Sequence, residues 1–186
     1  QNMGLLDSHH ISRILINPSN ADEVVVGVVG HLYSKNEERG IFKTTNGGKT
    51  WNKTLYIDDE TGIIDVVVSP KNFNVQYAAS WSKDRKAWDF IGSGATSGIY
   101  KSEDAGLTWK LFTTAESGFP VGEGVGRIGL AVYDDATVYA VLDNQFKRPL
   151  ESKNSNSLPI AFSVPGDEFL KIPNNSLHSI LKNYRL

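Results

Sequence analysis

Apolar and polar residues alternate in short runs along most of the first 143 residues, and the runs end at turn-forming residues. Residues 14–29 (ILINPSNADEVVVGVV) and 66–81 (VVVSPKNFNVQYAASW) each contain an apolar run, a Pro-x-Asn turn and a second apolar run. This pattern is typical of two strands joined by a tight turn. A degenerate third copy, residues 128–142 (IGLAVYDDATVYAVL), lacks the proline and has a shorter turn. We therefore expect three strand–turn–strand hairpins.

A second pattern follows each of the first two hairpins. Residues 40–51 (GIFKTTNGGKTW) and 98–109 (GIYKSEDAGLTW) are identical at six positions. Each begins as an alternating strand and continues into a turn whose hydroxyl and Asn or Asp side chains can accept hydrogen bonds from backbone amides. The glycines suit positive φ, and the tryptophans are expected as buried wedges between packed layers. The predicted structural residues are Thr44, Asn46, Gly48, Thr50, Trp51, Ser102, Asp104, Gly106, Thr108 and Trp109.

The combined unit is four antiparallel strands, which is the size of a β-propeller blade. We predict an all-β fold in residues 1–143, with blades at about 11–57, 62–114 and 126–143, the third supplying only two strands. Propellers typically close with about four to eight blades, so two and a half do not close. We expect a fragment of a multi-bladed propeller whose remaining blades belong to a longer chain. The alternative is that its open edge strands pair with another chain.

Residues 144–186 show a different pattern and are predicted as a loop insertion. Residues 152–157 (SKNSNS) are polar. Beyond them, residues 174–186 place Leu177, Ile180, Leu181 and Tyr184 at helical spacing, with Asn175 or Ser176 as the cap. This spacing predicts a short amphipathic C-terminal helix.

Composition narrows the function classes. The 186 residues carry a net charge of −2 and no cysteine. Neither disulfides nor thiolate metal sites are therefore expected, and no basic surface favours nucleic acid. No apolar run approaches the roughly 18 residues that a membrane span needs.

The hairpin order predicts which edge of the sheets carries function. The tight turns fall on one edge, and the long loops 30–39, 82–97 and 112–126 fall on the other. Long loops on a rigid scaffold commonly carry function. The candidate ligand-binding residues near this edge or in the central channel are His10, Arg13, His31, Asp65, Arg85, Trp88 and Arg127.

The first strand of each blade begins with one charged residue, and these are Arg13, Asp65 and Arg127. We expect Asp65 to lie between the two arginines, which would lower its pKa. Asp65 is then the catalytic candidate, as a nucleophile or base rather than a general acid. The alternative to a charged ligand cradle is a solvated or salt-bridged channel lining.

Further chemistry is less sharply indicated. Trp88 suits stacking on a sugar ring or a peptide side chain. The alternative is a structural role, in which Trp88 packs its own loop against the protein. His9, His10 and His31 could ligate zinc, but adjacent histidines in a strand point apart. Asn46 and Asp104 lack the further acidic ligands of a calcium loop. We therefore expect no metal and no cofactor.

Glycoside hydrolysis needs two carboxylates, and no spacing selects a pair among Glu37, Glu38, Asp65, Asp84 and Glu123.

The hydroxyl-x-Asp-x-Gly-x-Thr-Trp turn is the Asp-box, or BNR repeat. It is complete at 102–109, whereas at 44–51 Asn46 replaces the Asp. Residues 4–142 resemble the bacterial sortilin/Vps10-like BNR propellers, often labelled glycosyl hydrolases, of the sialidase and xyloglucanase-like superfamily. The resemblance rests on DSHHISRILINP, NEERGIFKTTNGGKTW, GIIDVVVSPKN and SGIYKSEDAGLTW.

The resemblance implies a secreted, periplasmic or cell-surface propeller that serves as a binding or protein-interaction module for a peptide or glycan. The alternative that it implies is a glycoside hydrolase with its site on the long-loop face. The arginine triad and nucleophilic tyrosine of a sialidase are not recognisable, so the sequence leaves open whether the protein is an enzyme.

Overall fold

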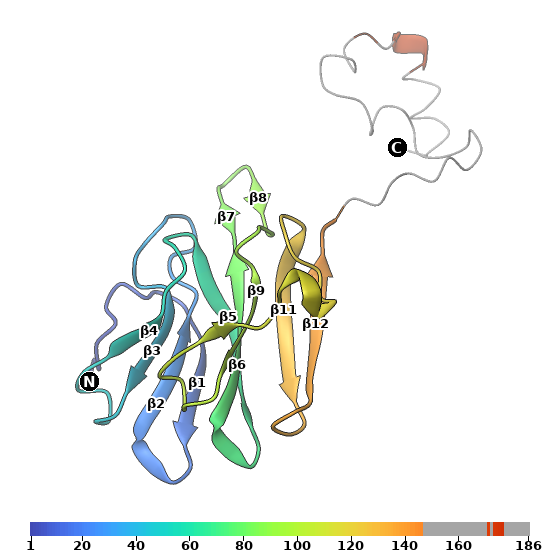
Figure 1. Cartoon of the computed structure of the whole chain (residues 1–186). Helices are drawn as coiled ribbons and strands as arrows, with labels where there is room; N and C mark the ends of the chain where they lie inside the picture. The colour runs from blue at the N-terminus through green and yellow to red at the C-terminus, as the bar shows by residue number, and fades with distance from the viewer. Residues whose placement is uncertain (147–170, 172, 177–186) are drawn as a thin grey trace. The chain divides into compact units, whose positions relative to one another are not determined.

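The computed structural model describes residues 1–146, 171 and 173–176, and its core is all-β. The first blade is an antiparallel sheet in the order β1-β2-β3-β4, made of Ile11–Asn17, Asn20–Val28, Gly40–Thr44 and Asn52–Leu55. The second has the order β10-β9-β6-β5, with β5 Thr61–Ser69, β6 Asn72–Ser82, β9 Gly98–Ser102 and β10 Lys110–Leu111. In the third, β11 (Val125–Val132) pairs with β12 (Val138–Asn144). The predicted four-stranded antiparallel blades are confirmed (Figure 1).

The blades repeat the same strand register. Ile14 lies opposite Val26 in the first hairpin, and Val66 lies opposite Ala78 in the second. Figure 1 shows the β1–β2, β5–β6 and β11–β12 turns at one edge and the long connections at the other, as the sequence predicted. The long-loop edge is therefore a real feature of the fold.

Two apolar cores hold neighbouring blades together. Between the first and second blades, Val25 and Ile41 pack with Ile63, Val66 and Ala78. Between the second and third, the core residues are Val75, Tyr77, Ala79, Ile99, Val125 and Ile128. Strands β2, β3, β5, β6 and β9 each contribute apolar side chains to two different cores, which is why the sequence shows short apolar runs instead of a clean one-sided alternation.

The first Asp-box turn is closed by its own side chains. Thr44 Oγ1 accepts a hydrogen bond from Gly48 N at 3.0 Å, and Asn46 Oδ1 accepts one from Thr50 N at 3.0 Å. Gly48 has φ +82°, a left-handed conformation that glycine adopts without strain. The turn thus satisfies its amides locally.

The second Asp-box turn repeats this arrangement with a carboxylate. Ser102 Oγ accepts from Gly106 N at 2.9 Å, and Asp104 Oδ1 accepts from Thr108 N at 2.8 Å. Burial alone raises the pKa of Asp104, but hydrogen bonds from Thr108 and Ser102 lower it below its ordinary value. The carboxylate is therefore held ionised by its own turn.

The two Asp-box tryptophans are only half-buried, so the predicted burial is wrong in degree. Trp109 packs against the core between the first and second blades, and its Nε1 donates to Gly106 O at 3.2 Å. Trp51 instead packs against the first-blade cluster of Val26, Val28 and Phe42, and its Nε1 donates to Met3 O at 2.8 Å. Each ring keeps one side in water because it lies at the tight-turn edge, where the packed layer ends.

Two further details differ from the predicted pattern. The 82–97 segment is not a plain loop: β7 (Asp84–Arg85) pairs with β8 (Phe90–Ile91) in a small hairpin. A single 3-10 turn, η1 (Ala115–Ser117), follows β10. Elements of two or three residues are too short to leave a hydrophobic period in the sequence.

The C-terminal predictions meet the structure only in part. Residues 174–176 are helical, and the rest of the predicted helix lies outside the described residues. The strands all belong to one compact unit, Gln1–Lys147, and Arg148–Leu186 form another. The domain boundary near residue 143 stays a prediction. Within the described part of the chain, no helix is long and apolar enough to cross a membrane.

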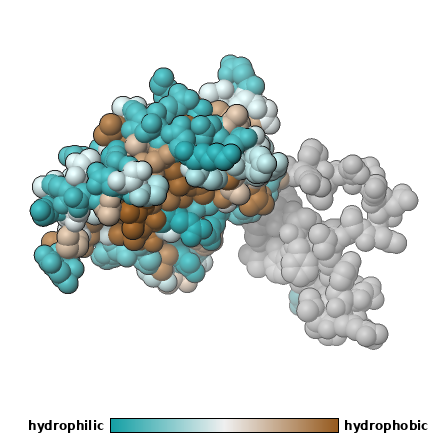
Figure 2. Space-filling model, turned by 90° about the horizontal axis from the view of Figure 1, so that it is seen from below, coloured by the Kyte–Doolittle hydropathy of each residue, from teal (hydrophilic) through white to brown (hydrophobic). Residues whose placement is uncertain are grey.

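The outer face of the first blade exposes apolar side chains. A groove of about 310 Å³ there is lined mainly by Met3, Leu5, Ile11, Ile14, Ile16, Val24, Val26 and Trp51. Figure 2 shows brown apolar surface among hydrophilic side chains when the molecule is seen from below. Ile14 is at the position in the repeat that Val66 fills in the second blade, where it is buried against the first. A neighbouring blade at this face remains our prediction.

Candidate functional site

A cavity of about 380 Å³ opens on the long-loop face. Its walls come from the β4–β5 connection, from the 82–97 segment and from the β10–β11 connection. The lining residues are Asp58, Glu60, Ser82, Lys83, Asp84, Ile91, Ser93, Gly94, Ala95, Thr96 and Glu123. This lining offers hydroxyls, carboxylates and one ammonium group, so it suits a polar ligand.

Lys83 is the buried cation of this cavity, with 6% of its surface exposed. Its Nζ donates to His31 O at 3.0 Å and to Leu32 O at 3.4 Å. Burial, followed by the neighbouring Arg39 and Arg85 guanidinium groups, lowers the pKa of Lys83 to about 8, while the Asp84 carboxylate opposes this shift. An amine in this range loses its proton much closer to neutrality than an ordinary lysine.

Arg39 fixes the long loop beside Lys83. The guanidinium is buried and donates to Val29 O at 2.6 Å, to Ser34 O at 2.8 Å, and to the carbonyls of His31 and Glu60. Burial lowers its pKa from the ordinary value. Arg39 and Lys83 therefore share His31 O, and this contact fastens the 30–39 loop of the first blade to the second blade.

The carboxylates that line the cavity differ in how far they are engaged. Asp58 caps the start of β5: its Oδ1 accepts from Glu60 N at 2.9 Å and from Thr61 N at 2.6 Å. Glu60 pairs with Lys35 at 2.6 Å, and Asp84 pairs with Lys86. Glu123 is exposed and has no hydrogen-bond or ion-pair partner within the described residues. Glu123 is the carboxylate most available to a ligand.

The β7–β8 hairpin extends from the cavity rim and carries aromatic side chains. Asp84 and Ile91 on its two strands line the cavity. Arg85 lies over the Phe90 ring at 5.3 Å. Trp88, at the tip, is 83% exposed, so it does not pack the loop down. A large ring held in water on a hairpin is a natural contact for a ligand.

Asp65 lies at the centre of the inner strands, but only one of the two expected arginines contacts it. Its Oδ1 accepts from Arg13 Nε at 2.9 Å, and its Oδ2 accepts from Leu130 N, also at 2.9 Å. Arg127 is exposed, and its side chain has no hydrogen bond or ion pair with any described residue. The expected Arg–Asp–Arg arrangement is therefore wrong: the partner from the third blade is a backbone amide.

Bulges explain this difference. The pairing of β5 with β6 shifts between Ile63 and Asp65, and that of β11 with β12 shifts between Val125 and Ile128. Such shifts re-aim side chains locally. Among the described strands, β11 pairs only with β12 and so has one unpaired edge. Its amides on that edge are available to a carboxylate. With both oxygens engaged, Asp65 ties three blades together.

The remaining predicted residues are dispersed. His10 Nδ1 lies 3.0 Å from Gly30 O, and His31 pairs with Asp7 at 2.8 Å. His10, Arg13, His31, Asp65, Arg85, Trp88 and Arg127 are all absent from the cavity lining. Their assignment as ligand-binding residues remains a proposal.

Sequence reasoning missed Lys83, Asp58, Glu60 and Thr96, although it named Asp84 and Glu123 as carboxylate candidates. Lys83 and Thr96 lie within the loop that was singled out, so the loop was identifiable while its cavity-facing members were not. Asp7 was also missed: with His9 and His31 it forms a group whose ligand atoms lie within 4.8 Å of one another, the one possible metal-binding group of this kind in the described residues.

The chain has a distant structural likeness to a known enzyme. No protein-family model matches the chain, and no curated protein matches it. Among solved structures, the chain is similar to the crystal structure of an ancestral GH74 enzyme, with a TM-score of 0.47 and 19% sequence identity. The match covers 74% of this chain and 17% of that chain, so this chain spans less than a fifth of that enzyme's length.

Proposed function

We propose that this propeller segment binds carbohydrate on its long-loop face. The cavity lined by Lys83 and Glu123 would take the polar groups of the ligand, and Trp88 would stack on a sugar ring. Sugar hydroxyls match carboxylate and hydroxyl partners, while the apolar faces of sugar rings match an aromatic surface. A secreted or periplasmic location, which the family resemblance implies, belongs to the same proposal.

The observation that carries the proposal is the joint placement of the polar cavity and the exposed Trp88. Asp84 and Ile91 line the cavity and also pair in the hairpin that carries Trp88, so the aromatic ring is attached to the cavity rim. A peptide ligand would be expected to add to an open strand edge or to occupy an apolar groove. The long-loop cavity is polar instead, which favours a glycan over a peptide.

A glycan panel screened with the full chain tests the proposal. We expect binding to at least one oligosaccharide, and we expect Trp88→Ala to weaken it by at least about tenfold, the loss of one stacking contact. Tyr139→Ala is the matched control, because Tyr139 is a similarly exposed aromatic, 67%, on β12 away from the hairpin. Equal losses in the two variants, or peptides binding where glycans do not, would refute carbohydrate recognition here.

Hydrolysis is the second candidate, because Glu123 is an exposed and unengaged carboxylate in the same cavity as Asp84. Glycoside hydrolysis requires a pair of carboxylates. If these two residues act, incubation of a bound oligosaccharide with the protein releases new reducing ends, and Glu123→Gln abolishes this release while binding persists. Binding without release by the parent protein leaves the chain as a binding module.

A further inference from the structure

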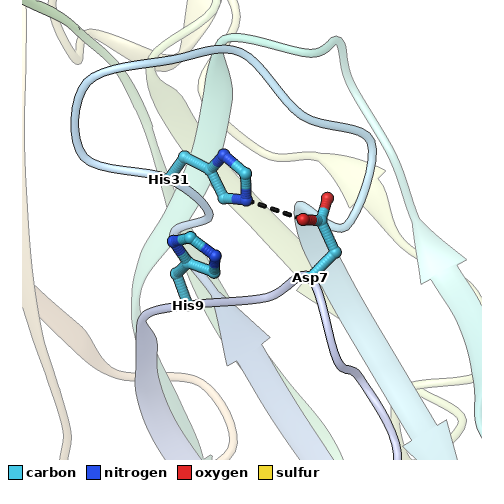
Figure 3. Close-up of side chains that lie close together, drawn as sticks. All are labelled: Asp7, His9 and His31. Carbon is cyan, nitrogen blue, oxygen red and sulfur yellow. Dashed lines mark hydrogen bonds and ion pairs between the residues drawn. The ribbon is translucent and has the colours of Figure 1, made fainter.

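We propose that Asp7, His9 and His31 form a binding site for a divalent transition-metal ion, with Zn²⁺ as the reference ion. Figure 3 shows the three side chains converging where the N-terminal segment meets the 30–39 loop. Their ligand atoms lie within 4.8 Å of one another, and His31 Nε2 is 2.8 Å from Asp7 Oδ1. Two imidazoles and one carboxylate are borderline donors that suit Zn²⁺, Co²⁺ or Ni²⁺ more than Mg²⁺ or Ca²⁺. The site departs from the sequence-based expectation of no metal.

The surroundings of His31 already orient it as a ligand. Its Nδ1 lies 2.7 Å from Ser34 Oγ, which directs the opposite nitrogen, Nε2, toward Asp7. Metal-bound histidines commonly make such a contact through their second nitrogen, and it fixes the ring orientation. Nε2 is then the coordinating atom.

Asp7 is oriented by hydrogen bonds from Asn36. The Asn36 amide donates to Asp7 O at 2.7 Å and to Asp7 Oδ2 at 3.2 Å, while its own Oδ1 accepts from His31 N at 3.0 Å. The hydrogen bond from Asn36, followed by that with His31, lowers the pKa of Asp7, so the carboxylate is ionised. Asn36 is buried and positions both of these ligands from one side.

Binding requires a small separation of Asp7 and His31 and a rotation of the His9 ring. Bond lengths of about 2.0–2.2 Å separate neighbouring tetrahedral ligand atoms by about 3.3 Å, so Asp7 and His31 must part by about half an ångström as the metal takes the place of the shared proton. His9 must turn more, because its ring is stacked on His31 at 3.7 Å with planes 23° apart. A coordinating lone pair lies in the ring plane, so two stacked rings cannot share one ion.

His9 is free to make this turn. It is exposed, and it forms no hydrogen bond with any described residue. Its backbone has φ +50°, an uncommon conformation for a residue other than glycine. Backbone strain of this kind clusters at ligand-binding and active sites. With three protein ligands, the fourth position of a tetrahedral ion is left to water or to a ligand.

The test is Zn²⁺ titration of the full chain without an affinity tag, by calorimetry and by competition with a chromogenic chelator. Co²⁺ titration adds a coordination signature in the visible spectrum. We expect one ion per chain, with affinity reduced at least about tenfold in His9→Ala and His31→Ala. Ser34→Ala, which alters only the orienting contact, is expected to lose about tenfold or more. His10→Ala is the matched control, because His10 is adjacent in sequence but bonds to Gly30 O.

The outcomes distinguish a metal site from a purely structural role, in which these residues only hydrogen-bond the N-terminal segment to the 30–39 loop. His9 contributes no hydrogen bond to the fold, so His9→Ala should fold even if His31→Ala does not. Circular dichroism melts of each variant check this. Zn²⁺ binding that is no weaker in His9→Ala, or that His10→Ala reduces equally, would overturn the proposal. So would a dissociation constant above about 1 mM for the parent protein.

Discussion

The Lys43→Met substitution gives the sharpest test of how the blades are joined. Lys43 Nζ donates to Ala105 O in the second Asp-box turn at 2.7 Å and pairs with Glu23 at 2.5 Å. The Lys43 side chain is only 3% exposed and that of Glu23 is 19% exposed. One ammonium group therefore links the first blade to a backbone carbonyl of the second. Methionine keeps the length of the apolar stem and removes the charge.

The expected cost follows from what is left behind. Removing one partner of a buried ion pair costs about 3–5 kcal/mol. Glu23 keeps a 2.6 Å hydrogen bond from Asn17 and some contact with water, so we expect about 2–4 kcal/mol. Lys101 is the matched control, because it fills the same position in the second Asp-box. Its side chain is 25% exposed and pairs with the exposed Glu103, so Lys101→Met should cost less than about 1 kcal/mol.

Urea unfolding followed by tryptophan fluorescence measures the loss of unfolding free energy in both variants. The comparison requires that the dependence of this free energy on urea concentration is the same in the variants and the parent. The pH dependence supplies a second check. The hydrogen bond from Lys43 lowers the pKa of Glu23, and burial opposes this effect. The folded pKa lies below the unfolded value, so this stabilisation is present above the ordinary value of 4.5 and is lost as the pH falls through the folded pKa. Equal losses of stability in Lys43→Met and Lys101→Met would refute the reasoning. So would a stability difference between the parent protein and Lys43→Met that stays the same in acid.

Two further predictions concern packing and protonation. Trp109→Ala should cost about 2–4 kcal/mol, somewhat less than for a fully buried ring, and Trp51→Ala should cost less, since Trp51 lies outside the core between blades; equal urea midpoints would contradict this. The pKa of Lys83 is about 8 when folded, against 10.5 for its ordinary value, so the unfolded state binds more protons between these values and stability should rise with pH across that window. Lys83→Met should lack the rise, as urea titrations at pH 8 and pH 10 would show.

Local chemistry made much of the fold readable from the sequence. The Asp-box turns close through side chains at most four positions apart, such as Thr44 with Gly48, so their residue types are visible as a motif. The hairpins likewise follow from strand propensity and adjacent turn residues. The repeat of these units was enough to predict the blade order and the edge that carries the long loops.

The candidate sites were not readable in the same way, because they are made by contacts between blades and between distant loops. Asp65 meets Leu130 N across 65 positions, through bulges that no hydrophobic period reveals. Lys83 reaches His31 O across 52 positions, and only blade packing buries it and lowers its pKa.

The sequence by itself thus determined the repeated unit, because the interactions that form each turn and hairpin lie within a few residues of one another. Tertiary structure alone decided which polar groups are buried, which are paired and which, like Trp88 and Glu123, face water on the long-loop edge. The physical reason is that burial and pairing depend on how neighbouring blades stack, and a period along the chain does not encode the stagger between them.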